Sequence, residues 1–293
     1  MIAEVLGVVT PVFVIAAIGY LWQRRGMPFD NATVSTLVMM VGSPCLIYSS
    51  LTRNPPETDA LFTMMGIAAG AIVLGLVLAA PVIRLAGWRQ TAYLPSMIHA
   101  NTGNMGLPVA LLAFGENGLA LAMAYFFVNS ISQFTLGEAL SAQRFHPAHL
   151  LRQPVIWAVL VVFIVLFGEV QPPAWVDATA QLLGGLTIPA MLLMLGTSLA
   201  RLNLASVRET FAASCLRLTL GVVIALIAIY ALDLDGMLAG VVLLQCTMPT
   251  AVFNYVFADR YDREPDKVAA VVLQSTLLSV LTLPLMVGFA LSL

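Results

Sequence analysis

Ten long apolar runs dominate this sequence and constrain its fold more than any other feature. A helix needs about 20 mostly apolar residues to cross the hydrocarbon core of a bilayer, and most of these runs reach that length. Strands are disfavoured because the runs lack alternation, and only helices or closed barrels satisfy the backbone in lipid. We therefore predict an all-α integral membrane protein with ten transmembrane helices. The predicted spans cover residues 3–22, 33–51, 61–86, 92–115, 117–141, 154–169, 175–199, 206–232, 236–258 and 267–291.

Composition supports this class and excludes others. Hydrophobic residues make up 60% and charged residues 10% of the 293 residues, whereas about 25% of an ordinary soluble domain is charged. The lipid bilayer is therefore an expected partner, and nucleic acid is not. The first run has Glu4 where a signal peptide has basic residues, so we expect it to be retained as a span. The sequence has no Cys/His cluster of metal-ligand spacing, and we expect no metal and no cofactor.

The distribution of basic residues predicts the orientation. Of the 13 Lys and Arg residues, all but Arg53 and Arg217 follow odd-numbered spans. By the positive-inside rule these loops face the cytoplasm. We therefore expect a multi-pass protein of the cell (inner) membrane with both termini on the extracytoplasmic side. The residues of the basic loops are Arg24, Arg25, Arg84, Arg89, Arg144, Arg152, Arg201, Arg208, Arg260, Arg263 and Lys267.

Ten spans divide evenly into two sets of five. Because each set holds an odd number of spans, the two halves insert in opposite orientations, which is the inverted-repeat design of many secondary transporters. We predict one repeat in residues 1–145 and a second, inverted repeat in residues 146–293. Weak echoes between the halves support this division, namely Pro44 with Pro189, Asn104 with Gln245, Pro108 with Pro249, and Asn129 with Gln274.

Two polar interruptions, His99 to Pro108 in span 4 and Gln245 to Asn254 in span 9, break otherwise apolar helices near the bilayer midplane. Glycine and proline disfavour a continuous helix in both. Pro108 and Pro249 suit the first turn of a new half-helix. The freed N–H groups of Val109, Ala110, Thr250 and Ala251 are then expected to point at the centre, where two half-helix ends make a site for an anion. The alternative is that both are simple proline kinks, which would not need so many amides.

We predict one binding site from these interruptions and the polar faces of spans 5 and 10. Those faces either complete the site or hold helices together by hydrogen bonds. The predicted substrate-binding residues are Asn101, Thr102, Asn104, Pro108, Asn129, Gln133, Gln245, Thr247, Pro249 and Asn254, with His99 and Ser275 as accessory residues.

The charges near the breaks limit the mechanism. Neither break contains Asp or Glu, so a carboxylate-based proton or sodium antiport is disfavoured. Dipoles and amides can hold a monoanion that keeps some water. Arg217 in span 8 is either a cation for this site or a partner of Glu138, and His99 is either a packing residue or a proton carrier.

The N-terminal pattern from Pro11 through Gly19-Tyr20, the sequence NTGNMGLP from Asn101 to Pro108, the proline-centred span 9 and the Ser/Thr-rich span 10 resemble the auxin efflux carrier family. Its bacterial members include malonate and malate permeases, and its fold is related to that of bile-acid/sodium symporters. The resemblance implies that broken helices 4 and 9 cross, that helices 1, 2, 6 and 7 form a scaffold, and that helices 3–5 and 8–10 form a transport domain. It also implies an elevator-type motion and a homodimer. By motif, it assigns Pro108 and Pro249 to the crossover and Asn104, Asn129 and Gln245 to substrate contact.

We therefore expect a secondary transporter of small organic anions, such as malonate, malate or auxin-like acids, and not an enzyme. The first alternative is a sodium-coupled organic-anion symporter; those symporters carry an acid in crossing span 9, where this chain has Gln245-Cys246-Thr247. Proton or sodium coupling is left open. A more remote alternative is an intramembrane enzyme or receptor, which the lack of HExxH, GxSxG and paired-aspartate motifs disfavours.

Overall fold

A computed structural model describes residues 2–53, 57–144, 154–168, 171–201 and 207–293. Within these ranges the regular structure is helical, apart from one isolated β-bridge. The first half of the chain forms α1 (Ile2–Arg24), α2 (Asn31–Leu37), η1 (Val38–Gly42), α3 (Ser43–Arg53), α4 (Thr58–Leu85), α5 (Gln90–Ile98), η2 (Thr102–Gly106), α6 (Leu107–Ser132), η3 (Gln133–Gly137) and α7 (Glu138–Ala142), where η marks a π-helical turn.

The second half of the chain is also helical where it is described. Its elements are α8 (Pro154–Phe167), α9 (Ala174–Arg201), α10 (Val207–Ala231), α11 (Gly236–Thr247), α12 (Phe253–Arg260) and α13 (Pro265–Ala290). The expected boundary between residues 145 and 146 falls outside the described residues, as does Arg152.

Seven helical stretches of the described chain are long and apolar enough to cross a membrane. Each predicted span corresponds to helical structure, but α8 and α11 are shorter apolar helices, and the predicted spans 92–115 and 236–258 are each divided. The boundary expected between residues 115 and 117 is confirmed, because α6 consists of two helices joined by a kink at Gly115. There φ is 66°, a conformation that glycine adopts without steric cost.

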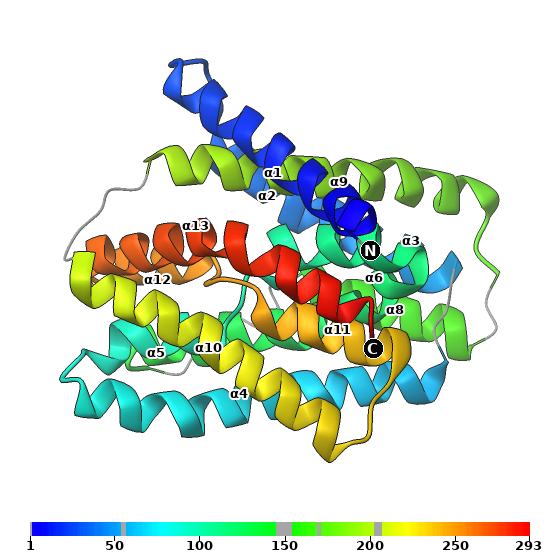
Figure 1. Cartoon of the computed structure of the whole chain (residues 1–293). Coiled ribbons are helices and arrows are strands. Elements are labelled where there is room, and N and C mark those ends of the chain that lie inside the picture. The colour runs from blue at the N-terminus through cyan, green and yellow to red at the C-terminus, as the bar shows by residue number, and fades with distance from the viewer. Residues whose placement is uncertain (1, 54–56, 145–153, 169–170, 202–206) are drawn as a thin grey trace.

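The helices pack in two groups. In one group α9 packs against α1, α2 and α3, and α8 packs against α3. Figure 1 shows α1 and α9 together on the upper side of the molecule. Gly19 and Gly196 allow this close approach, because a Cβ on Gly19 would collide with the carbonyl of Leu193, and one on Gly196 with the carbonyl of Ala16.

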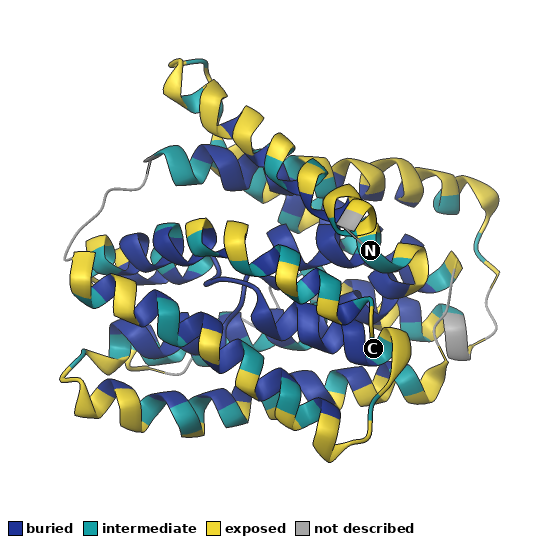
Figure 2. Cartoon of the chain, in the orientation of Figure 1, coloured by how far each residue is buried: buried dark blue, intermediate teal, exposed yellow. Residues whose placement is uncertain are grey.

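The second group contains α4, α5, α6, α10, α11 and α13, with α12 against α13. Its central helix is α11, where every residue from Ala239 to Gln245 is buried. Figure 2 shows the buried residues gathered where the helices meet and the exposed ones on the outward faces of α1, α4 and α9. Many exposed residues are large and apolar, for example Leu182 and Leu85. Such faces are suited to lipid or to a partner subunit.

The connections gather at two ends of the molecule. In Figure 1 the turns after α1, α4 and α12 lie toward the left, whereas the chain termini and the α10–α11 connection lie on the other side. Arg24, Arg89 and Arg260 belong to these left-hand turns or to the helix ends beside them. These three residues, which contributed to the predicted orientation, are thus brought to one end.

Candidate functional site at the helix crossing

The two polar interruptions cross each other as extended chain. Helix α5 ends at Ile98 and α11 ends at Thr247, and the next residues leave the helical conformation. Ala100 and Thr250 form an antiparallel bridge. Two backbone hydrogen bonds hold it: the N–H of Asn101 donates to the Pro249 carbonyl at 2.7 Å, and the N–H of Ala251 donates to the His99 carbonyl at 3.1 Å. The expected crossing of two broken helices is therefore present in the structure.

The correspondence between the two breaks differs from the one that the sequence suggested. The sequence alignment of the two interruptions placed Asn104 against Gln245 and Pro108 against Pro249. In the structure Pro249 lies in the extended segment, whereas Pro108 lies inside a helix. Counted four residues onward from Ala100 and from Thr250, the residues that correspond in the two breaks are Asn104 and Asn254. The prolines misled the alignment because they occupy different conformations.

Pro108 lies in the first turn of α6 as predicted, whereas Pro249 does not lie in a first turn, because α12 begins only at Phe253. After the first break the helix resumes at Thr102, so Val109 and Ala110 lie well inside it. A wide π-helical turn precedes Pro108, where the N–H of Leu107 donates to Thr102 five residues earlier. The N–H groups that lack an earlier helical carbonyl are therefore those at the start of η2, from Thr102 to Asn104.

At the second break the two predicted N–H groups already have partners. The N–H of Thr250 donates to Ser275 Oγ at 3.2 Å, and that of Ala251 donates to the His99 carbonyl. Ser275, predicted as an accessory binding residue, thus holds the crossing in place. The N–H groups of Thr250 and Ala251 are therefore not free to bind a ligand in this structure.

A buried amide network supports the crossing. Asn129 Nδ2 donates to Thr102 Oγ1 at 3.0 Å and to the Ala100 carbonyl at 3.4 Å. Gln133 Nε2 donates to Asn254 Oδ1 at 3.3 Å, and Asn254 Nδ2 donates to the His99 carbonyl at 3.2 Å. These amides therefore join helices in this structure.

The remaining predicted residues lie deeper. His99 Nε2 is 3.0 Å from Ser132 Oγ, and Thr247 Oγ1 donates back to the Leu243 carbonyl of its own helix. Gln245 is fully buried, and neither Nε2 nor Oε1 has a hydrogen-bond partner among the described residues. Its amide lies against Gly106, where a Cβ would collide with Oε1.

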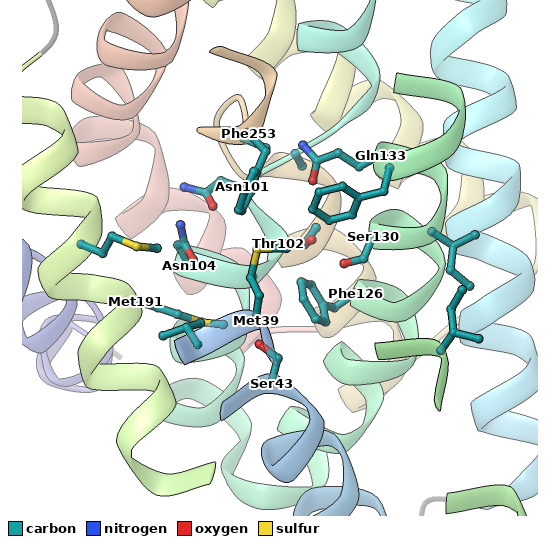
Figure 3. A pocket seen from close by; sticks show the side chains of 18 residues that line it. Met39, Ser43, Asn101, Thr102, Asn104, Phe126, Ser130, Gln133, Met191 and Phe253 are labelled. Atoms are coloured by element: carbon teal, nitrogen blue, oxygen red, sulfur yellow. The ribbon is translucent and has the colours of Figure 1, made fainter. Parts of the chain in front are cut away.

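A cavity lies in front of the crossing. Four predicted residues line it: Asn101, Thr102, Asn104 and Gln133. Asn101 is 4% exposed, and its Nδ2 has no partner among the described residues. Figure 3 shows the labelled side chains converging from both helix groups. The residues around the cavity are Val38, Met39, Ser43, Ala100, Asn101, Thr102, Gly103, Asn104, Phe126, Ser130, Ile131, Gln133, Phe134, Ile156, Met191, Met194, Ala251 and Phe253.

The part of this cavity that the group of α1, α2, α3, α8 and α9 contributes was not predicted. Met39 and Ser43 come from η1 and α3, and Met191 and Met194 come from α9. The one indication near them in the sequence is the pair of prolines Pro44 and Pro189, which we interpret as evidence for the predicted repeat. Apolar methionines in an apolar run give no further indication of a lining role.

Arg217 lies behind the crossing and is 3% exposed. Its guanidinium donates to three backbone carbonyls, whereas Glu138 accepts from Tyr261 at 2.6 Å and pairs with Arg260 at 3.6 Å. The Arg217–Glu138 pairing considered from the sequence is not found among the described residues. Arg217 therefore contacts the backbone of both broken helices.

An all-helical membrane protein with a cavity at two broken, crossing helices has the architecture of a membrane transporter. The family described as membrane transport protein matches residues 4–147 and 139–287, and this chain belongs to that family, the auxin efflux carriers. It is a multi-pass membrane transporter, which excludes the alternative of an intramembrane enzyme.

The relatives are distant, and each match spans nearly all of both chains. The chain is 27% identical over 293 residues to an uncharacterized transporter of Methanothermobacter thermautotrophicus, covering 94% of this chain and 95% of the relative. It is 26% identical over 306 residues to a Rhizobium meliloti protein named "Putative malonate transporter", covering 96% of this chain and 94% of the relative. It is also 22% identical to an uncharacterized transporter of Methanocaldococcus jannaschii, over 96% of this chain and 97% of the relative.

Proposed function

We propose that this protein is a secondary transporter of small organic anions, such as malonate, malate or auxin-like acids, and that the substrate carboxylate binds in the cavity at the crossing. One observation carries the proposal. The cavity meets the start of a helix at Thr102 to Asn104, and the unpartnered Nδ2 of Asn101 lies beside it. Helix starts present N–H donors and a positive partial charge, which suit a carboxylate.

The lining chemistry favours an anion over a cation. No residue around the cavity, as far as the chain is described, carries a charge. The polar groups include amides and hydroxyls, and the rest are aliphatic, aromatic or methionine side chains. Such a site offers donors for a carboxylate and apolar contact for a short carbon chain. The name of the Rhizobium meliloti relative agrees with a carboxylate substrate.

The transport motion we propose is of the elevator type. The group of α1, α2, α3, α8 and α9 would be the scaffold, and the group of α4 to α7 and α10 to α13 would be the moving domain. The cavity supports this, because its lining comes from both groups. Sliding of the second group past the first would expose the crossing to each side in turn. The two groups would be built from inverted repeats in residues 1–145 and 146–293.

We propose further that both termini are extracytoplasmic and that the protein is a homodimer. Clustering of the basic turns at one end supports the orientation. The exposed apolar face of α9, which includes Leu182 and Leu186, supports a subunit contact on the scaffold. Labelling of cysteines introduced near the two termini, measured in intact cells, tests the orientation. Cross-linking of the Leu186→Cys variant tests the dimer.

Uptake by proteoliposomes tests the proposed function. Purified protein is reconstituted, and uptake of radiolabelled malonate, malate and acetate is measured with no gradient, a proton gradient or a sodium gradient. Empty liposomes are the control. Saturable uptake of at least one carboxylate is expected. If no carboxylate is taken up under any gradient while the protein is folded in the liposomes, the proposal is wrong.

A second candidate is a sodium-coupled organic-anion symporter. It is favoured by Gln245, whose buried Oε1 has no partner among the described residues and could serve a cation. The same uptake experiment separates the two candidates. Strict dependence on sodium, lost in Gln245→Leu, would favour the symporter, whereas uptake in sodium-free medium would favour the uncoupled carrier.

A further inference from the structure

Two helix C-terminal ends meet behind the crossing. Helix α5 ends at Ile98 and α11 ends at Thr247, and the antiparallel bridge between Ala100 and Thr250 brings both ends together. The last carbonyls of a helix have no N–H partner within it. They also carry the negative partial charge of the helix dipole, about half an elementary charge at each end. Two such ends in the apolar interior need a compensating positive group.

Arg217 of α10 supplies that group. Its Nη1 donates to the Met97 carbonyl of α5 at 3.1 Å. Its Nη2 donates to the Cys246 carbonyl at 2.9 Å and to the Met248 carbonyl at 3.0 Å, both at the end of α11. One guanidinium thus bridges the ends of both broken helices.

No carboxylate pairs with Arg217 among the described residues, so the positive charge is held by backbone oxygens. Burying an ion costs several kcal/mol unless its environment compensates. Here three carbonyls at two negative helix ends do so. A planar guanidinium with several fixed donors suits three oxygens from two chains better than an ammonium group does.

The packing of α10 is adapted to this contact. Gly221 lies one turn after Arg217 on the same face of the helix. A Cβ on Gly221 would collide with the Cys246 carbonyl. The glycine therefore lets α10 lie directly against the end of α11, which brings the guanidinium within reach of its three oxygens.

We propose that Arg217 is a built-in cation that occupies the place between the two helix ends where the carbonyl oxygens would otherwise bind a free cation. Carbonyl oxygens are ordinary ligands of hard cations, and three of them surround a single guanidinium here. With the guanidinium in place, the negative partial charges of the two helix ends are neutralised without a bound ion. The consequence for transport, which rests on the proposed function, is that anion uptake needs no cation at this position.

The binding test uses purified, detergent-solubilised full-length protein and does not depend on any substrate. Melting temperatures of wild type, Arg217→Ala, Arg217→Met and Arg217→Lys are measured in equal concentrations of sodium, potassium, methylguanidinium or choline chloride. Arg217→Ala should melt several degrees lower in choline chloride and recover part of the loss in methylguanidinium chloride. Arg217→Met fills the space with an apolar chain and should not recover.

Two further results decide the proposal if Arg217→Ala does not fold. Arg217→Lys should fold and should melt at the same temperature in sodium as in choline, because the ammonium group takes the position of the ion. Wild type should show no cation-specific stabilisation. A saturable rise of the wild-type melting temperature with sodium would overturn the proposal, as would equal behaviour of Arg217→Ala and Arg217→Met in methylguanidinium.

Transport is measured separately in proteoliposomes, with wild type and Arg217→Lys in sodium-free medium. Both should take up the same carboxylate without sodium. If neither takes up any carboxylate while the melting data follow the pattern above, the proposed substrate fails and the built-in cation stands. If uptake by wild type requires sodium while the melting data show no sodium effect, the transport consequence drawn here is wrong.

Discussion

Ala100 and Thr250 pair as antiparallel chain at the point where two broken helices cross. The pairing separates the two kinds of helix end. The C-terminal ends of α5 and α11 meet Arg217 on one side. The start of the helix at Thr102 meets the cavity on the other. On one side of the crossing Arg217 thus compensates the negative ends of two helices. On the other side the start of a helix offers N–H donors to the cavity.

Replacing Asn129 with alanine should destabilise the fold. The side chain donates to Thr102 Oγ1 and to the Ala100 carbonyl at the crossing, and loss of a buried partner costs about 1–3 kcal/mol. Thermal melting in detergent should show a clear decrease. Asn117→Ala is the matched control, because Asn117 is exposed on the same helix. Equal melting of the two variants would show that the network does not support the crossing.

Gly106→Ala should also be destabilising, by about 1–3 kcal/mol, because the new Cβ would collide with the Gln245 side chain in a packed region. A Gly70→Ala control should be neutral or slightly stabilising, since nothing lies within 4 Å of a Cβ there. If Gly106→Ala melts like wild type, Gln245 has room to move and the tight contact is not essential.

Tyr261→Phe should lower the melting temperature near neutral pH. Tyr261 donates to Glu138 at 2.6 Å and joins the turn after α12 to α7. Burial and the Glu138 carboxylate raise the pKa of Tyr261, so the contact is complete below the ordinary tyrosine pKa of about 10. It should be lost as the pH rises through the raised pKa. The difference from wild type should therefore shrink at high pH. Tyr230→Phe, at an exposed position, is the control; equal effects of the two variants at neutral pH would contradict this role.

Much of the helical arrangement can be predicted from the sequence, because twenty-residue apolar runs leave few alternatives in a membrane. The interruptions were equally visible as polar residues, glycine and proline. Which residues of the two breaks correspond could not be predicted. A proline is compatible both with the extended chain at Pro249 and with a helix after a π-helical turn at Pro108. The partners of Arg217 are backbone carbonyls, which leave no trace in residue identity. The lining methionines were missed for a similar reason, since in sequence they look like any lipid-facing residue.

The central claim is that an anion binds in the cavity beside Asn101. Isothermal titration calorimetry of malonate binding to purified wild type and to Asn101→Asp tests it most directly. Asparagine and aspartate are equally good residues before a helix start, but the aspartate charge would be buried, so thermal melting of the variant is measured alongside to show that it is folded. Its carboxylate should repel the ligand and weaken binding at least tenfold, whereas Asn117→Asp should bind like wild type. Undiminished malonate binding by Asn101→Asp would contradict this placement of the site.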